Sequence, residues 1–293
     1  MQLYFIRVIS LIAIALVYML FDVLNKRNVP SIFAYLTLGY GFLLTILYFD
    51  LSTILISIAV SAVILGIGYI VYKIGQLGAA DVIEFATVSL IMPMQQIPLI
   101  ISHVNQLNFP FILSLLINTG IVALIIVPLY YIPKAVSKLK RPISSFVTKQ
   151  SIIMASSLAI AYVVFISFIV IVIGFNYVAI VILSLMMASS FLVIMFSTPI
   201  MLSMIEYVSV DRFDEGDIIA VNLMKKRSID SIKRKVKDFD RLITSKTIKE
   251  MKSKKIKGKL PVYKEAMPFA SAIFIALILT ILIGNILLFI IEI

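Results

Sequence analysis

Long uninterrupted runs of apolar residues, separated by short polar connections, dominate the hydropathy pattern of the chain. Since a helix needs roughly 20 mostly apolar residues to cross a bilayer, this pattern predicts eight transmembrane helices. They are expected at about Leu3–Leu24, Ile32–Phe49, Leu51–Tyr72, Ala80–Ile101, Phe109–Ile132, Ser151–Gly174, Val178–Glu206 and Pro268–Ile291. Two pairs of runs are joined so closely, at Asp50 and at Phe175–Tyr177, that we expect tight hairpins there.

The composition favours the same fold class. Of the 293 residues, 61% are hydrophobic and 14% are charged, whereas about 25% of residues are charged in an ordinary soluble domain. A soluble fold of this size cannot bury so much apolar surface, so we predict an all-α polytopic membrane protein. The chain has no cysteine, which excludes disulfides, thiolate metal sites and cysteine nucleophiles. Its one histidine, His103, excludes multi-histidine metal sites and argues against a serine–histidine triad.

The basic residues occupy alternate connections between the apolar runs. In an eight-helix arrangement, 25 of the 26 Lys and Arg residues fall on one side, and Arg7 alone lies on the other. The short connections on the basic side contain Lys26, Arg27, Lys73, Lys134, Lys138, Lys140, Arg141 and Lys149. By the positive-inside rule, the basic side is the cytoplasm, and both termini are expected outside the cell membrane.

The connection before the last apolar run is long and strongly basic. Tyr207–Met267 holds 17 basic and 9 acidic residues, a net charge of +8. We therefore expect three parts: residues 1–206 with the first seven helices, residues 207–267 as a basic cytoplasmic loop or small subdomain, and residues 268–293 with the last helix. Within the insert, Asp214–Asp217 followed by Ile218–Val221 predicts a turn and then a short strand.

Two interpretations of this insert stay open. The first is a solvated loop with an amphipathic helix. The second is contact of Lys225–Arg227 and Lys252–Lys259 with anionic lipid headgroups. Nucleic acid is not an expected partner, because few aromatic residues lie between the basic ones.

Three acidic residues fall at membrane depth, namely Asp22, Asp81 and Glu84. A charged carboxylate at the bilayer centre costs about 2.5–3.5 kcal/mol on insertion scales, so such residues are usually functional. Asp22 precedes Lys26 by four residues, about 6 Å along a helix, and Asp81 follows Lys73 at the cytoplasmic start of the fourth run. Two carboxylates from different helices are thus expected at the same depth and on the same side.

This arrangement suits a pair of aspartates that share one proton. Two carboxylates a few ångströms apart cannot both ionise, so one is charged and the other is neutral. The charged carboxylate can take a proton from water, and the neutral acid can donate one to a peptide carbonyl oxygen. We therefore predict Asp22 and Asp81 as catalytic residues of amide hydrolysis that needs neither a metal nor a cofactor.

Each of these residues also has a simpler interpretation. Asp22 could pair with Lys26 or Arg27 at the membrane boundary, and Asp81 could cap its own helix. Glu84 could bind substrate, tune the ionisation of Asp81, or pair with Lys73, and we predict a supporting role for it. Gly78 would allow the backbone of a substrate to come close.

The two segments that contain Asp22 and Asp81 resemble the motifs of a known family. Phe21–Pro30 is similar to the first motif of the type IV prepilin peptidases, especially of their archaeal relatives, the preflagellin (prearchaellin) peptidases. Leu77–Val82 resembles their second motif, Gly-x-Gly-Asp, with Ala80 in place of the second glycine. The entry to the last run, Met267–Phe269, resembles a Pro-Phe element near the end of these enzymes.

The resemblance implies an aspartic endopeptidase at the cytoplasmic face of the cell membrane. Its substrates would be archaellin or type IV pilin-like precursors, from which it removes a short basic leader. Bacterial members often also methylate the new terminus and carry a cysteine-bearing insert after the first helix. This chain has a short connection there and no cysteine, so we expect no methyltransferase activity.

Two other functions remain open at this point. An ion-coupled secondary transporter would use buried acids to carry protons or cations, with broken helices near the bilayer midplane. A non-catalytic membrane scaffold would use the lysine-rich insert as its docking surface.

Overall fold

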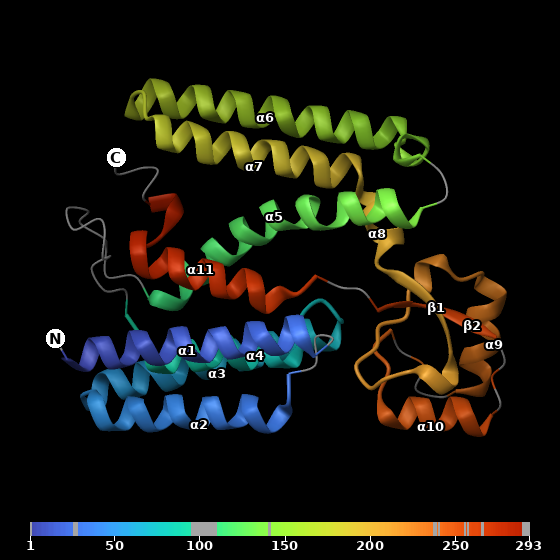
Figure 1. The fold of residues 1–293 in the computed structure, drawn as a ribbon, viewed down its shortest axis with the longest axis horizontal. Helices are drawn as coiled ribbons and strands as arrows, with labels where there is room; N and C mark the ends of the chain where they lie inside the picture. The colour runs from blue at the N-terminus through green and yellow to red at the C-terminus, as the bar shows by residue number, and fades with distance from the viewer. Residues whose placement is uncertain are drawn as a thin grey trace.

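The protein is predominantly helical, as the computed structural model in Figure 1 shows. The structure describes residues 2–25, 29–94, 110–139, 142–236, 239, 241–254, 256, 258–264 and 267–288. The apolar helices are α1 (Gln2–Leu24), α2 (Ser31–Tyr48), α3 (Leu51–Lys73), α4 (Ala79–Ile91), α5 (Phe111–Lys138), α6 (Lys149–Ile173), α7 (Tyr177–Met195) and α11 (Phe269–Ile283).

Among the described residues, five helices are long and apolar enough to cross a membrane, namely α1, α3, α5, α6 and α7. Two further apolar helices, α2 and α11, are shorter. The architecture is therefore that of a helical membrane protein. Figure 1 shows the N-terminus and the α2–α3 and α6–α7 turns at one end, and the α5–α6 connection at the other. The N-terminus and two of the connections without basic residues thus lie at the end opposite the basic α5–α6 connection. Lys26, Arg27, Lys140 and Arg141 lie outside the described residues.

Helix α4 differs from the expected run Ala80–Ile101, because it ends at Ile91. Met92 has left the helical conformation, with φ −132° and ψ 80°, and Pro93 follows it. A residue before proline is disfavoured in the α region, so this proline ends the helix. Its 13 residues span about 20 Å, less than the roughly 30 Å of a bilayer core. The expected remainder of the run, 95–101, lies outside the described residues.

The expected seventh helix, Val178–Glu206, is also interrupted. Helix α7 ends at Met195, and a separate short helix, α8 (Ser197–Ser203), leads into strand β1 (Ile205–Ser209). Pro199 has no N–H for the carbonyl of Met195, so a continuous helix would lose a hydrogen bond at this point. The chain therefore leaves the apolar helix before Glu206, which lies exposed on the strand.

Helix α11 ends at Ile283, the chain is helical again at 286–288, and the last residues of the expected run, 289–291, lie outside the described residues. Gly284 takes a positive φ of 77°, a conformation that favours glycine. The buried side chain of Asn118, on α5, stabilises this break: its Nδ2 donates to Thr280 Oγ1 and to Gly284 O, each at 2.8 Å. Its Oδ1 accepts from the N–H of Ile286 at 3.0 Å. One asparagine thus satisfies backbone groups that the break exposes, and it ties α5 to α11.

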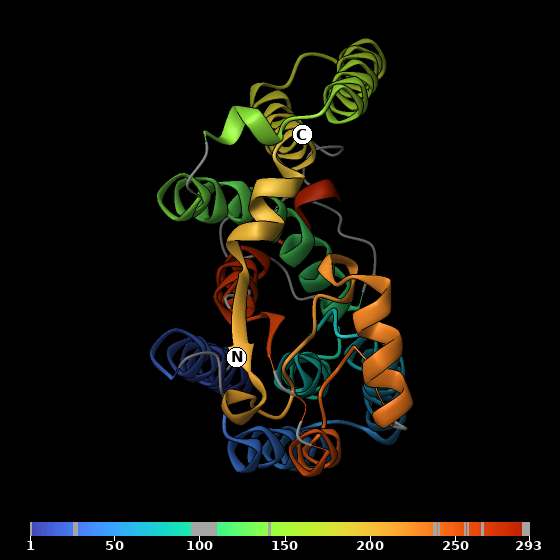
Figure 2. The same ribbon diagram turned by 90° about the vertical axis from the view of Figure 1, so that its right-hand side faces the viewer.

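Residues 205–264, the basic segment, fold around a hydrophobic cluster of their own. Strand β1 pairs antiparallel with β2 (Lys259–Tyr263), and helices α9 (Lys226–Lys235) and α10 (Ser245–Ser253) lie between them in sequence. The expected strand at Ile218–Val221 does not form; Ile218 and Ile219 make only isolated bridges, to Leu242 and Val262. Figure 2 shows the basic segment in front of the ends of the apolar helices.

Helix α4 lies at the centre of the first helices, between α2 and α3. Gly68 on α3 allows the closest approach, since a Cβ there would lie 2.2 Å from Val82 Cγ1. On the other side, Thr45 of α2 donates its hydroxyl to Leu90 O at 2.9 Å. The main hydrophobic core then continues from α4 to α1, α5 and α11. The N-terminal end of α4 is thereby fixed beside the C-terminal end of α1.

Candidate active site

Asp22 lies in the last turn of α1 and is 8% exposed. Its Oδ2 accepts a hydrogen bond from the backbone N–H of Ala270 at 3.0 Å. Ala270 belongs to the first turn of α11, where backbone N–H groups have no partner within the helix. Asp22 therefore caps a helix that lies 248 residues further along the chain.

Asp81 lies in the first turn of α4, and its Oδ2 accepts from the N–H of Gly78 at 3.1 Å. This is the capping arrangement that the sequence offers as the simpler interpretation of Asp81. It does not exclude catalysis, because one carboxylate oxygen is enough for the cap. Gly78 takes part directly: a Cβ at this position would lie 2.8 Å from Asp81 Oδ2. A side chain at position 78 would therefore push the carboxylate away, while the predicted contact of Gly78 with substrate remains a prediction.

The structure brings Asp22 and Asp81 together. Tyr18, one turn before Asp22, forms a buried cluster with Ala270. Ala80 and Ile83, on either side of Asp81, pack against this cluster. The two carboxyl groups lie close enough for their charges to act on each other. Two acids that the sequence places on separate helices thus share one site, where α1, α4 and α11 meet.

Glu84 joins this group from one turn further into α4. Its side chain is fully buried, and neither carboxyl oxygen has a hydrogen-bond partner among the residues that the structure describes. The charges of Asp81 and Asp22 both act on it. The proposed pairing with Lys73 does not form: Lys73 is exposed, and its Nζ lies over the ring of Tyr69, 5.0 Å from the centroid.

Tyr18 is a member of the site that the sequence analysis does not single out. It is fully buried, and its hydroxyl lies 3.0 Å from Thr37 Oγ1. Thr37 donates its own proton to Ala34 O at 2.8 Å, so the tyrosine is the donor between the two hydroxyls. The charges of Glu84 and Asp81 act on Tyr18. Its spacing of four residues from Asp22, which puts both on one helix face, is the signal that could have identified it.

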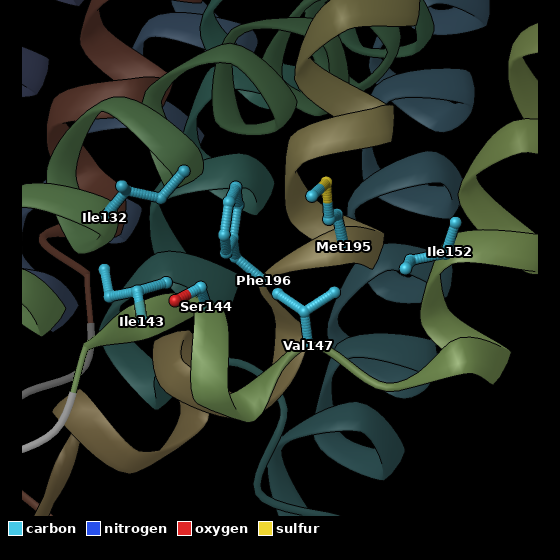
Figure 3. A pocket seen from close by; sticks show the side chains of 7 residues that line it. All are labelled: Ile132, Ile143, Ser144, Val147, Ile152, Met195 and Phe196. Carbon is cyan, nitrogen blue, oxygen red and sulfur yellow. The ribbon is translucent and has the colours of Figure 1, made fainter.

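An apolar pocket among the described residues lies away from these acids. It has a volume of about 460 Å³ and lies between α5, α6, the end of α7 and a short 3₁₀ helix at Ile143–Phe146 (Figure 3). Its walls are apolar apart from Ser144, so it offers no acid or base. The described residues include no cluster of His, Cys, Asp and Glu side chains that could hold a metal ion. The carboxyl groups of the acid cluster can transfer protons to and from a bound substrate or water.

The chain matches no model of a protein family, no curated protein and no solved structure. The resemblance to the prepilin peptidases stays a prediction from the sequence motifs, chiefly those around Asp22 and Asp81.

Proposed function

We propose that this protein is a membrane aspartic endopeptidase of the prepilin or preflagellin peptidase type, with Asp22 and Asp81 as its general acid–base pair. One observation carries the proposal: two carboxyl groups from the ends of different helices, Asp22 buried and Asp81 partly exposed, share one site and act on each other electrostatically. Two carboxyl groups this close do not readily ionise together, so one can hold a proton while the other is charged.

The pair can hydrolyse a peptide bond with its own protons. The charged aspartate takes a proton from water as the water oxygen attacks the peptide carbonyl carbon, and the neutral aspartate protonates the carbonyl oxygen. The tetrahedral intermediate then breaks its C–N bond: the leaving nitrogen takes the proton that the first aspartate removed from water, and the former carbonyl oxygen returns its proton to the second aspartate. The water is divided between the new carboxyl and amino termini, and the dyad still holds one proton.

The substrate class follows from the surroundings of the site. We propose that the helices cross the cell membrane eight times, with the acid cluster and the basic segment at the cytoplasmic face. A precursor with an apolar helix in the bilayer and a short basic leader in the cytoplasm would present the bond between them at this depth. Archaellin and pilin-like precursors have this form. The lysine-rich surface of the basic segment would then contact anionic lipid headgroups.

Cleavage in membranes tests this function directly. Membranes that contain the full chain are incubated with an archaellin-type precursor, and the product is identified by its mass and its new N-terminus. The proposal predicts one cut between the basic leader and the apolar helix, without methylation of the new terminus. An intact precursor in membranes that contain the folded protein would contradict it.

An ion-coupled transporter remains the second candidate, because the break in α11 is a feature that such proteins use. Half-helices that end inside a bundle bind ions in many transporters, and Gly284 and Asn285 end α11 beside the buried Asn118. Here the amide of Asn118 already satisfies the groups at the break. Proton-driven uptake by proteoliposomes, lost in Asp81→Asn, would favour transport over proteolysis.

A further inference from the structure

Glu84 is a buried acid that the proposed reaction does not require. It is 0% exposed, and within the described part of the chain both carboxyl oxygens lack a hydrogen-bond partner. Other buried polar side chains of α4 do have partners: Thr87 donates to Ile83 O at 2.9 Å, and Ser89 donates to Ala86 O at 2.8 Å. A polar group retained in an apolar core without a partner has no structural benefit, because its desolvation is not compensated.

The charges around Glu84 make its position still less favourable for a carboxylate. Helices α1, α2, α3 and α5 pack on α4, and the groups whose charges act on Glu84 are Asp81 on its own helix and Asp22 on α1. From α1, Tyr18 also faces this carboxyl group. No basic side chain on the described parts of α2, α3 or α5 is among the groups that act on it. A second or third negative charge in this site would be repelled and would not be solvated.

We propose that Glu84 is held as a neutral carboxylic acid and serves as the proton reserve of the Asp22–Asp81 pair. This inference rests on the proposed peptidase function. Between the attack of water and the collapse of the intermediate, the aspartate that protonated the carbonyl oxygen is charged. Glu84 gives this aspartate a proton and recovers one from the pair when the intermediate returns its proton. The bonds broken and formed are O–H bonds of carboxyl groups, and no proton is gained or lost.

The protonation of Glu84 can be measured without any substrate. Infrared spectra of the purified full chain in lipid bilayers at pH 7 separate the C=O band of protonated carboxyl groups from the bands of carboxylates. Part of the protonated band is expected to disappear in Glu84→Gln and to persist in Glu206→Gln, a matched control on the exposed face of β1. An unchanged protonated band in Glu84→Gln means that Glu84 is charged, and this result overturns the inference.

Thermal unfolding shows whether the Glu84 variants still fold. A neutral carboxyl without a partner adds nothing that an apolar side chain lacks. Glu84→Gln and Glu84→Leu are therefore expected to melt at or above the temperature of the wild type. A large fall in melting temperature in both variants would show that the carboxyl group has a structural partner, and would overturn the inference.

The reserve role has its own readout in precursor cleavage. Glutamine keeps the shape of Glu84 but cannot give up a proton, so kcat is expected to fall at least tenfold with KM unchanged, whereas Glu206→Gln keeps both values. A wild-type kcat in Glu84→Gln would overturn the reserve role and leave the peptidase standing. If the wild-type chain cuts no precursor, both the proposed function and the reserve role are contradicted. The infrared spectra still show whether Glu84 is protonated.

Discussion

Asp22, in the last turn of α1, accepts a hydrogen bond from the backbone N–H of Ala270, in the first turn of α11, at 3.0 Å. This bond joins the beginning of the chain to its last helix and holds one carboxyl oxygen of Asp22 in place. The other acid of the pair, Asp81, is held in the same manner by Gly78 at the start of α4. Both aspartates therefore have a structural role, and the tests below separate that role from catalysis.

Replacing Asp81 by two different residues separates capping from proton transfer. Asparagine at position 81 can still accept the hydrogen bond from the Gly78 N–H, whereas alanine removes the acceptor, at a cost of about 1 kcal/mol of stability. We expect Asp81→Asn to melt close to the wild type and Asp81→Ala to melt lower, while both lose precursor cleavage. Thermal melting and cleavage are measured on the same preparations. If Asp81→Asn is fully active and only the less stable Asp81→Ala loses cleavage, Asp81 acts only as a helix cap.

Gly78→Ala tests the position of the Asp81 carboxylate. The added Cβ would lie 2.8 Å from Asp81 Oδ2, closer than carbon and oxygen can approach, so the carboxylate must move. We expect at least a tenfold loss of kcat, since a misplacement of about 1 Å can cost on the order of 100-fold. Gly39→Ala on α2 is the matched control, because a Cβ there has no atom within 4 Å. Equal activity of the two variants would contradict the geometry.

Asn118→Leu tests the break in α11. The leucine removes the acceptor of the Ile286 N–H and the donor to Gly284 O, and each unsatisfied buried group costs about 1–3 kcal/mol. We expect a lower melting temperature and an unchanged KM for the precursor. Asn222→Leu, on the exposed surface of the basic segment, should change neither. A stable Asn118→Leu variant that has lost ion-driven uptake would instead support the transporter.

Lys264 links stability to pH in the basic segment. Its Nζ lies 2.7 Å from Oδ2 of both Asp214 and Asp217. Burial lowers the pKa of Lys264, but the hydrogen bonds and charges of these two aspartates outweigh burial and raise it above 10.5. Because the pKa is higher in the folded state, the stabilisation is fully present below the unfolded value and is lost as the pH rises through the folded value.

We therefore expect the melting temperature to fall as the pH rises above about 10.5. Lys264→Met should start lower and lose this part of the pH dependence, whereas Lys264→Arg should stay charged and keep its melting temperature across the same range. Melting of the full chain between pH 9 and 12 measures the difference. The same alkaline fall in Lys264→Met and in the wild type would show that other groups cause it.

The apolar runs predict most of the helices, because burial in lipid requires long helical stretches whatever the tertiary structure. Three single residues account for the differences between the expected and the observed helices: Pro93 ends α4 early, Pro199 separates α7 from α8, and Gly284 breaks α11. Proline is visible in the sequence, but an apolar run tolerates it in many membrane helices. Hydropathy alone therefore does not show which prolines end a helix.

The acids of the candidate site could be found from the sequence, because carboxyl groups in apolar runs are rare and costly. Their partners could not. The bond from Ala270 to Asp22 spans 248 residues and depends on how α11 packs against α1. Tyr18 has no unusual feature in a helix rich in apolar residues, so its place beside the acids emerges only from the packing of α1 against α2 and α4.

Precursor cleavage by the charge-neutral variants Asp22→Asn and Asp81→Asn shows whether the two carboxyl groups transfer protons during catalysis. Asparagine can still accept the hydrogen bonds from Ala270 and Gly78, so the fold is kept while proton transfer is lost. With wild-type membranes and an exposed-site control, Asp211→Asn, the account predicts a fall in cleavage rate of about 100-fold or more for each dyad variant and none for the control. Wild-type cleavage by either dyad variant would contradict it.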